Sequence, residues 1–214
     1  MINQIIWIFR EPRSGGTWFT ERLALKYNRR LNFLDDQLSN VPLDISKKNF
    51  FLNRVQQEND KDAILNTHNF FALESLKNYQ NPIVIRISRK NKVEQFISGY
   101  IAEMLKNKFL NIDKVEQLKS FPKIDKFFID KKRMDFFIQH CKELDILWNT
   151  YSNPYRTEVV YYEDLLNSYS SDLLGIHNWS MQDNDVQPTY KIPYSKNELV
   201  INFNSVRSYL EQSL

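Results

Sequence analysis

The sequence predicts an α/β fold of three layers, in which helices cover both faces of a mainly parallel central sheet. Short apolar runs that are typical of buried strands recur along the chain. Segments with helical spacing follow them, and a pair of glycines stands at the first junction between the two patterns. Alternation of strand and helix patterns favours a parallel sheet whose strands are connected through crossover helices.

Four apolar runs are expected to form the parallel strands: residues 5–9, 63–66, 83–88 and 158–162. Each is short and rich in aliphatic or aromatic side chains, as buried strands are. Ligands of open parallel sheets bind beyond the carboxyl ends of the strands. The residues that follow these four runs are therefore the first place to look for a site.

Helices are expected where apolar residues recur every three or four positions. The first begins near the glycine pair, because Phe19, Leu23 and Tyr27 are spaced by four. A short final helix is expected around Val206 and Leu210. Two longer stripes lie between them: Val93, Phe96, Ile97, Tyr100, Ile101 and Met104, then Phe137, Cys141, Leu144, Trp148 and Tyr151.

Length and composition predict a single domain over residues 1–214. The chain is 42% hydrophobic and holds no apolar run of membrane-spanning length, and its start lacks a signal-peptide pattern. The single cysteine, Cys141, suits a reducing compartment, so a cytoplasmic location is expected. A net charge of +3 is too small to indicate nucleic acid. Without histidine or cysteine clusters no metal is expected, and the oligomeric state stays open.

The glycine pair follows the first apolar run, in the segment Arg13-Ser14-Gly15-Gly16-Thr17. Glycine lets successive N–H groups converge on an anion, and the next helix adds the positive end of its dipole. A lysine after the last glycine, as in a Walker A loop, is absent, and so is the G-x-G-x-x-G pattern. The segment predicts a P-loop-like phosphate-binding loop, and the alternative is a tight turn between strand and helix.

Residues 12–18 resemble the 5′-phosphosulfate loop of sulfotransferases that use 3′-phosphoadenosine 5′-phosphosulfate (PAPS), which reads roughly P-[KR]-S-G-[TS]-[TS]-W. The resemblance implies that Arg13 and the N–H groups of the loop stabilise the leaving phosphate. It also implies that Trp18 stacks on the adenine. The loop residues that would bind this cofactor are Arg13, Ser14, Gly15, Gly16, Thr17 and Trp18.

Three further segments resemble the same family, in the family's order along the chain. After the apolar run 83–88, Arg89 or Lys90 and then Ser98 match the 3′-phosphate segment. We favour Arg89, because a guanidinium fork suits a phosphate better than an ammonium. Tyr162 matches the tyrosine that borders the adenine. Near the C-terminus the family's R-K-G element is absent, and Lys191 is the candidate cation in its place.

His68 matches the family's histidine, which takes the proton from the acceptor hydroxyl. A neutral imidazole suits that task because its ordinary pKa lies near the working pH. Glu21 is the rival base, since some bacterial relatives use a glutamate. The family carries a lysine two residues before this histidine, and the chain has Asn66 at that position.

The sequence therefore predicts transfer of a sulfuryl group from PAPS to an acceptor hydroxyl or amine, leaving 3′-phosphoadenosine 5′-phosphate (PAP). The expected partner is a small-molecule, carbohydrate or peptide acceptor of open identity. One alternative is a small nucleotide kinase, which the missing P-loop lysine disfavours. Another is a catalytically degenerate nucleotide-binding or interaction module, which Asn66 at the family's lysine position makes credible.

Overall fold

The computed structural model describes residues 4–34, 63–108, 126–182 and 195–214, and the side chains of residues 105–108 lie outside this description. The chain forms two compact units. The first unit combines Met1–Lys90 with Leu144–Pro188, and the second combines Asn91–Glu143 with Thr189–Leu214. The expectation of a single domain over residues 1–214 stays a prediction, and the two units are described one at a time below.

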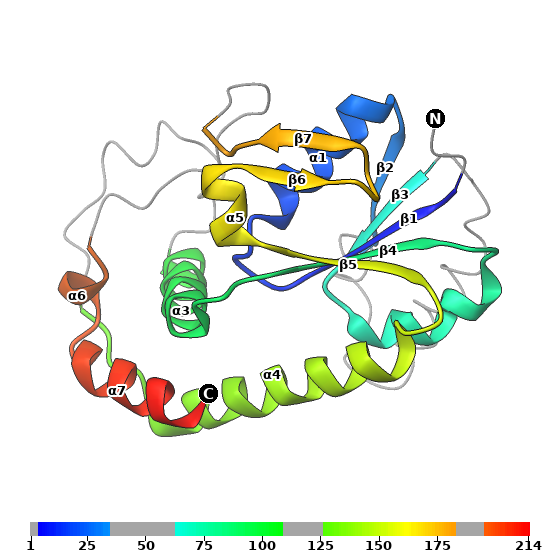
Figure 1. Ribbon diagram of the computed structural model, residues 1–214. Helices are drawn as coiled ribbons and strands as arrows, with labels where there is room; N and C mark the ends of the chain where they lie inside the picture. The colour runs from blue at the N-terminus through cyan, green and yellow to red at the C-terminus, as the bar shows by residue number, and fades with distance from the viewer. Residues whose placement is uncertain (1–3, 35–62, 109–125, 183–194) are drawn as a thin grey trace. The chain divides into compact units, whose positions relative to one another are not determined.

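The first unit is built on a five-stranded sheet in which all neighbouring strands pair in parallel, in the order β2-β3-β1-β4-β5 (Figure 1). This arrangement confirms the predicted parallel sheet. Strand β2 was not predicted, because it is short and only partly buried. The strands are β1 (Ile6–Arg10), β2 (Arg30–Phe33), β3 (Ala63–Thr67), β4 (Ile83–Ser88) and β5 (Arg156–Tyr161).

Alternation along β1 shows why the fold has three layers. Ile6 and Ile8 belong to one core cluster, which includes side chains of α1 (Gly16–Tyr27). Trp7 and Phe9 belong to a second cluster with the 3₁₀ helix η2 (Phe70–Asn78) and the end of α4 (Lys131–Tyr151). Helical elements therefore cover both faces of the sheet, as predicted.

The first core cluster also receives the segment that follows β5. Helix α5 (Tyr162–Asn167) starts directly at the end of that strand. It leads into an antiparallel pair, β6 (Tyr169–Ser171) and β7 (Ile176–Trp179). Leu165, Tyr169 and Trp179 pack with α1 in this cluster. Glu163 and Asp164 lie in the first turn of α5, where acidic side chains suit the helix dipole.

The second unit has an apolar cluster of its own, which contains the predicted stripe of α3 (Lys92–Lys108). The start of α4, helix α6 (Lys196–Leu199) and helix α7 (Phe203–Ser213) supply most of the other members, and Phe127, Ile129 and Val200 from the flanking segments supply the rest. The predicted final helix is confirmed, since Val206 and Leu210 are buried in α7. Among the helices described, none combines the length and the apolar character needed to cross a membrane.

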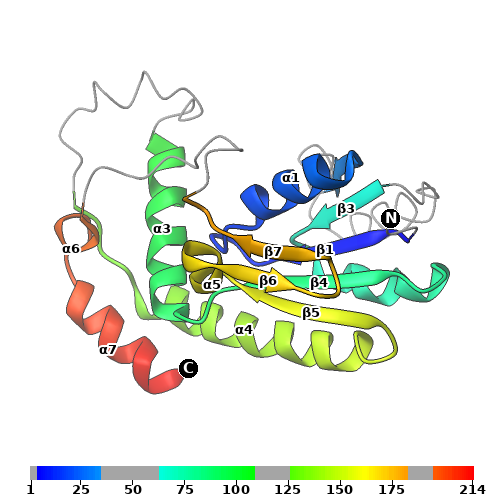
Figure 2. The same cartoon turned by 45° about the horizontal axis from the view of Figure 1, so that its top comes forward.

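The strand register brings the carboxyl ends of four strands to one edge of the sheet. Figure 2 shows strands β3, β1, β4 and β5 side by side. Phe9 pairs with Thr67, Arg10 with Ile87, and Ser88 with Tyr161. The next residue of each strand therefore emerges at this same edge: Glu11, His68, Arg89 and Tyr162.

Candidate anion-binding site

The turn between β1 and α1 has the backbone shape of an anion-binding loop. Arg13 has φ 59° and Gly15 has φ 73°, both in the left-handed region. Left-handed residues in a turn direct successive N–H groups to one side of the backbone, which forms a concavity for anions. A left-handed arginine is uncommon and indicates that the surrounding structure holds the loop in this shape.

The N-terminus of α1 is arranged to receive a negative charge. Gly15 is its N-cap residue, and no side chain caps the helix there. The first turn contains no acidic residue that would neutralise the helix dipole. Unpaired N–H groups of a first helical turn and the positive end of the dipole together favour an anion.

Both glycines of the loop are required by close packing. A Cβ on Gly15 would lie 2.9 Å from Cδ2 of Tyr162, and its φ is already unfavourable for other residues. A Cβ on Gly16 would lie 2.7 Å from Cβ of Arg10. Tyr162 thus packs directly against the loop from the end of β5. The two glycines therefore leave room for the side chains of Tyr162 and Arg10, in addition to allowing the turn.

The two hydroxyl groups of the loop have different roles. Ser14 is almost fully buried, and its Oγ donates to the carbonyl oxygen of Glu11 at 2.6 Å. The hydroxyl of Ser14 therefore closes the loop on itself. Thr17 is half-buried, and its Oγ1 accepts from Nη1 of Arg10 at 2.7 Å. Because the Thr17 oxygen is the acceptor in that bond, its own proton can be donated to an anion.

Trp18 does not have the environment that stacking on adenine requires. Its side chain is only 2% exposed and belongs to the first core cluster with Phe19 and Leu23. The guanidinium of Arg22 lies 5.2 Å from the centre of its ring system. In this structure Trp18 is a core residue of α1 with no open ring face. The prediction that Trp18 stacks on adenine therefore does not agree with this structure, because the helix directs Trp18 toward the sheet.

Two arginines and a tyrosine form the charged part of the site. The guanidinium of Arg89 lies 4.3 Å from the ring centre of Tyr162, the tyrosine that packs against Gly15. Arg13 is solvent-exposed, yet neighbouring atoms displace part of its hydration, and this desolvation lowers its pKa. The positive charge of Arg89 lowers the pKa of Arg13 further, while Tyr162 opposes the shift. Two mutually repelling guanidinium groups beside this turn would be stabilised by an anion between them.

Arg89, and not Lys90, is the residue directed to this loop. Nζ of Lys90 binds Oδ1 of Asp164 at 2.6 Å, and this hydrogen bond is the main cause that raises the pKa of Lys90. Nε of Arg89 is 3.7 Å from Oε1 of Glu163, and within the described residues that buried nitrogen makes no hydrogen bond. The basic pair after β4 is therefore divided between a surface ion pair and the candidate site.

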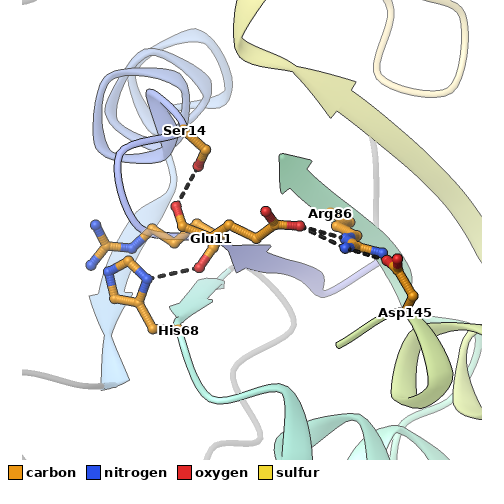
Figure 3. A network of polar contacts seen from close by, with 6 residues as sticks. Glu11, Ser14, His68, Arg86 and Asp145 are labelled. Carbon is orange, nitrogen blue, oxygen red and sulfur yellow. Dashed lines mark hydrogen bonds and ion pairs between the residues drawn. The ribbon is translucent and has the colours of Figure 1, made fainter. Parts of the chain in front are cut away.

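His68 follows β3 and is half-buried at the same sheet edge. Its Nδ1 lies 2.7 Å from the carbonyl oxygen of Arg10 (Figure 3). A carbonyl oxygen only accepts, so Nδ1 carries the proton, and the neutral ring then has its lone pair on Nε2. This tautomer suits a general base that acts through Nε2.

Glu21 stays a second candidate for the base. It is half-buried on α1, and burial raises the pKa of its carboxyl, while the nearby charge of Arg10 lowers it. A carboxylate with a raised pKa is a better base near neutral pH than an ordinary one. Both candidates are thus associated with Arg10, one through its carbonyl oxygen and the other through its charge.

Asn66 links the sheet to the first turn of α1. It is fully buried in β3, and its Nδ2 donates to Oγ1 of Thr20 at 2.6 Å. The hydroxyl of Thr20 donates in turn to the carbonyl oxygen of Gly16 at 2.6 Å. The residue at the family's lysine position therefore supports the loop from behind.

A buried ion cluster beneath the loop was missed by sequence reasoning (Figure 3). Arg86, in the middle of β4, binds Oε1 of Glu11 through Nε at 3.0 Å and through Nη2 at 2.6 Å. Nη2 also lies 2.7 Å from Oδ1 of Asp145 on α4. The available signal was the charged residue inside an apolar run, since a buried arginine requires a partner.

Two predicted site residues lie outside this group. Ser98 is a half-buried residue of α3 in the second unit, so its approach to Arg89 stays a prediction. Lys191 lies outside the described residues. Within the described part of the chain, no group of three or more histidine, cysteine, aspartate or glutamate residues is placed to hold a metal ion.

Comparison with known proteins finds similarity only among solved structures. No family model matches the chain, and no curated protein matches it. One similar structure is an uncharacterized protein from Eubacterium ventriosum, with a TM-score of 0.40 and 18% identity over 73% of this chain and 86% of that one. Another is described as "a putative kinase" from Chloroflexus aurantiacus, with a TM-score of 0.36 and 10% identity over 50% of this chain and 70% of that one. At these identities the similarity concerns the fold alone.

Proposed function

We propose that this chain is a sulfotransferase that moves a sulfuryl group from PAPS to an acceptor hydroxyl or amine. The observation that carries the proposal is the meeting of Arg13, Arg89 and Tyr162 around the glycine loop. These residues come from three strand ends, and each was singled out by resemblance to a cofactor-binding segment of that family. An anion-binding loop alone would not favour this cofactor over others.

The described residues fit a nucleotide with separate anionic groups. The loop N–H groups, Arg13 and the Thr17 hydroxyl offer donors to a 5′-phosphosulfate at the start of α1. Arg89 offers a buried Nε that makes no hydrogen bond within the described residues, which suits a second anion such as the 3′-phosphate. Tyr162, beneath the Arg89 guanidinium, is the aromatic residue proposed to border the adenine.

PAPS would supply an activated sulfuryl group, whose bond to the 5′-phosphate oxygen breaks as a bond to the acceptor oxygen or nitrogen forms. Negative charge accumulates on the leaving phosphate oxygen, where Arg13 and the loop N–H groups stabilise it. The acceptor proton passes to Nε2 of His68, whose opposite nitrogen is held by Arg10. Glu21 is the alternative destination for that proton.

The first test is calorimetry of the full chain with PAP and with Mg-ATP. We expect PAP to bind at least tenfold more tightly, because Arg13 and Arg89 provide for two anionic groups and the loop lacks the lysine of a Walker A motif. Tighter binding of Mg-ATP would overturn the proposal in favour of a nucleotide kinase. Binding of neither nucleotide would overturn it as well.

The second test measures transfer of labelled sulfate from PAPS to a panel of hydroxyl and amine acceptors. We expect His68→Ala to spare PAP binding and to reduce turnover by about 10²–10⁴, the usual contribution of a general base. Full turnover of His68→Ala together with an inactive Glu21→Gln variant would move the base to Glu21. Tight PAP binding without transfer to any acceptor would favour a non-catalytic nucleotide-binding module.

A further inference from the structure

We infer that the buried cluster of Glu11, Arg86 and Asp145 is a positioning device that sets the geometry of the phosphate loop and of His68 together. The inference rests on the proposed function, because it assigns these residues a part in cofactor binding and in turnover. None of the three touches the reacting atoms in this scheme. They act through the backbone at Arg10 and Glu11.

The cluster has the geometry of a specific clamp. Arg86 is 7% exposed and Glu11 is 2% exposed, so their charges meet out of water. Nε and Nη2 of Arg86 both donate to the same oxygen of Glu11, at 3.0 Å and 2.6 Å. Asp145, which is largely solvent-exposed, binds Nη2 from the outer side. A guanidinium held by two carboxylates in this way has little freedom to rotate.

The position of Arg86 follows from the alternation along β4. Ile85 and Ile87 belong to the first core cluster, so Arg86 points to the opposite face of the sheet. There its guanidinium lies 5.6 Å from the ring centre of Phe70 and 5.9 Å from that of Trp148. The two aromatic rings and the strand hold the Arg86 guanidinium in a fixed position. Its hydrogen bonds therefore restrict where the Glu11 carboxylate can lie.

Glu11 connects this cluster to the glycine loop and to His68 (Figure 3). Its backbone N–H donates to the carbonyl oxygen of Ile87 at 2.9 Å, which extends the pairing of β1 with β4 by one residue. Its carbonyl oxygen accepts from Oγ of Ser14, which closes the loop. The preceding carbonyl oxygen, that of Arg10, accepts from Nδ1 of His68. A shift of Glu11 would therefore displace the loop and change the tautomer of the base.

Stability alone is a weak explanation for such a cluster. Replacing a buried ion pair by apolar residues is often neutral or stabilising, so a chain selected for stability has no need of one. Misplacing reacting groups by about 1 Å can reduce rates by about 10². The clamp lies where a displacement of that size would reach the phosphate loop and His68 at once.

The test compares three variants of the full chain: Glu11→Gln, Arg86→Met and the double variant. Arg86→Met removes the guanidinium that binds the buried Glu11 carboxylate, and Glu11→Gln removes the buried carboxylate while Asp145 still contacts Arg86. The double variant removes both charges of the buried pair and should recover much of the lost thermal stability. We expect PAP binding to stay at least tenfold weaker in the folded double variant, and turnover to fall with it. Arg207→Met, which removes an exposed arginine paired with Glu211, is the matched control and should change neither.

A second readout does not depend on the ligand. Nitrogen NMR of His68, assigned by comparison with His68→Ala, reports which ring nitrogen carries the proton when the ring is neutral. We expect the Nδ1-protonated form in the wild type and a mixture of both forms in the double variant. A folded double variant with wild-type PAP affinity and an unchanged His68 tautomer would overturn the inference. Failure of the wild type to bind PAP, with the tautomer change still observed, would reject the proposed function and retain the positioning role.

Discussion

Arg86 lies within β4 and Arg89 directly follows that strand, yet the two arginines have opposite surroundings. Arg86 is enclosed by aromatic rings and binds two carboxylates, and these carboxylates raise its pKa against the lowering effect of burial. Arg89 stacks on Tyr162, has one carboxylate at 3.7 Å, and lies close enough to Arg13 to lower the pKa of that residue.

The difference separates an arginine whose charge the protein itself compensates from the arginine that we propose to bind a ligand. Within the sheet a positive charge has to be compensated by the protein, because unpaired burial is strongly unfavourable. Past the last pairing residue, Ser88, the chain reaches the sheet edge, where a ligand can complete the compensation. The degree to which local carboxylates satisfy an arginine therefore separates the two roles better than its position in the sequence.

The largest effect is expected from Arg86→Met. It removes the guanidinium that binds the buried carboxylate of Glu11, and breaking a buried ion pair on one side typically costs about 3–5 kcal/mol of unfolding free energy. Urea denaturation followed by circular dichroism measures the loss. A loss below about 1 kcal/mol would show that water or protonation relieves Glu11, and the contrast between the two arginines would disappear.

Arg89→Met is expected to affect binding and to leave stability nearly unchanged. Hydrogen bonds to charged groups contribute about 1.5–3 kcal/mol, so the affinity for PAP should fall by about 10–100-fold. The unfolding free energy should change much less than in Arg86→Met, because Arg89 has one carboxylate at 3.7 Å whereas Arg86 binds two. Lys90→Met is the matched control, since Lys90 pairs with Asp164, and calorimetry should show a smaller loss of affinity for it.

Gly15→Ala tests the contact that places Tyr162 beneath Arg89. Alanine there adds the strain of a left-handed φ to a clash at 2.9 Å with the Tyr162 ring. Gly175 is the control, because it has φ 52° and the nearest atom to an added Cβ is 3.7 Å away. We expect Gly15→Ala to lose about 1 kcal/mol more than Gly175→Ala, given strain costs of about 1–3 kcal/mol per residue. Equal losses would mean that Tyr162 moves aside freely.

The smallest effect concerns Glu21, which lies near the charge of a third arginine, Arg10. Because burial raises the folded-state pKa of Glu21, its contribution favours folding at low pH and is lost as pH rises through that raised pKa. Glutamine does not titrate, so the melting temperature of Glu21→Gln relative to the wild type should increase between pH 4 and pH 7. A difference that stays constant or decreases with pH would contradict the raised pKa.

Residues whose placement follows from local pattern could be predicted from the sequence. The strands β1, β3, β4 and β5 agree with the apolar runs to within two residues at either end. The order of strand ends then follows from parallel pairing. Long-range choices could not be predicted: the burial of Trp18, the pairing of Glu11 with Arg86, and the role of Asn66 all depend on which faces meet in three dimensions.

The contact between Gly15 and Tyr162 joins the beginning of the chain to a segment far along it. During folding, β1 and α1 can form early, but the turn between them acquires its final neighbours only when β5 docks at the far edge of the sheet. Contacts of such high sequence separation are slow to form, because a large loop has to close first. Ligand binding by the turn would thus require that β5 has already paired with the sheet. We therefore expect a chain truncated before β5 to lose the nucleotide binding proposed above, even if its first helix has formed.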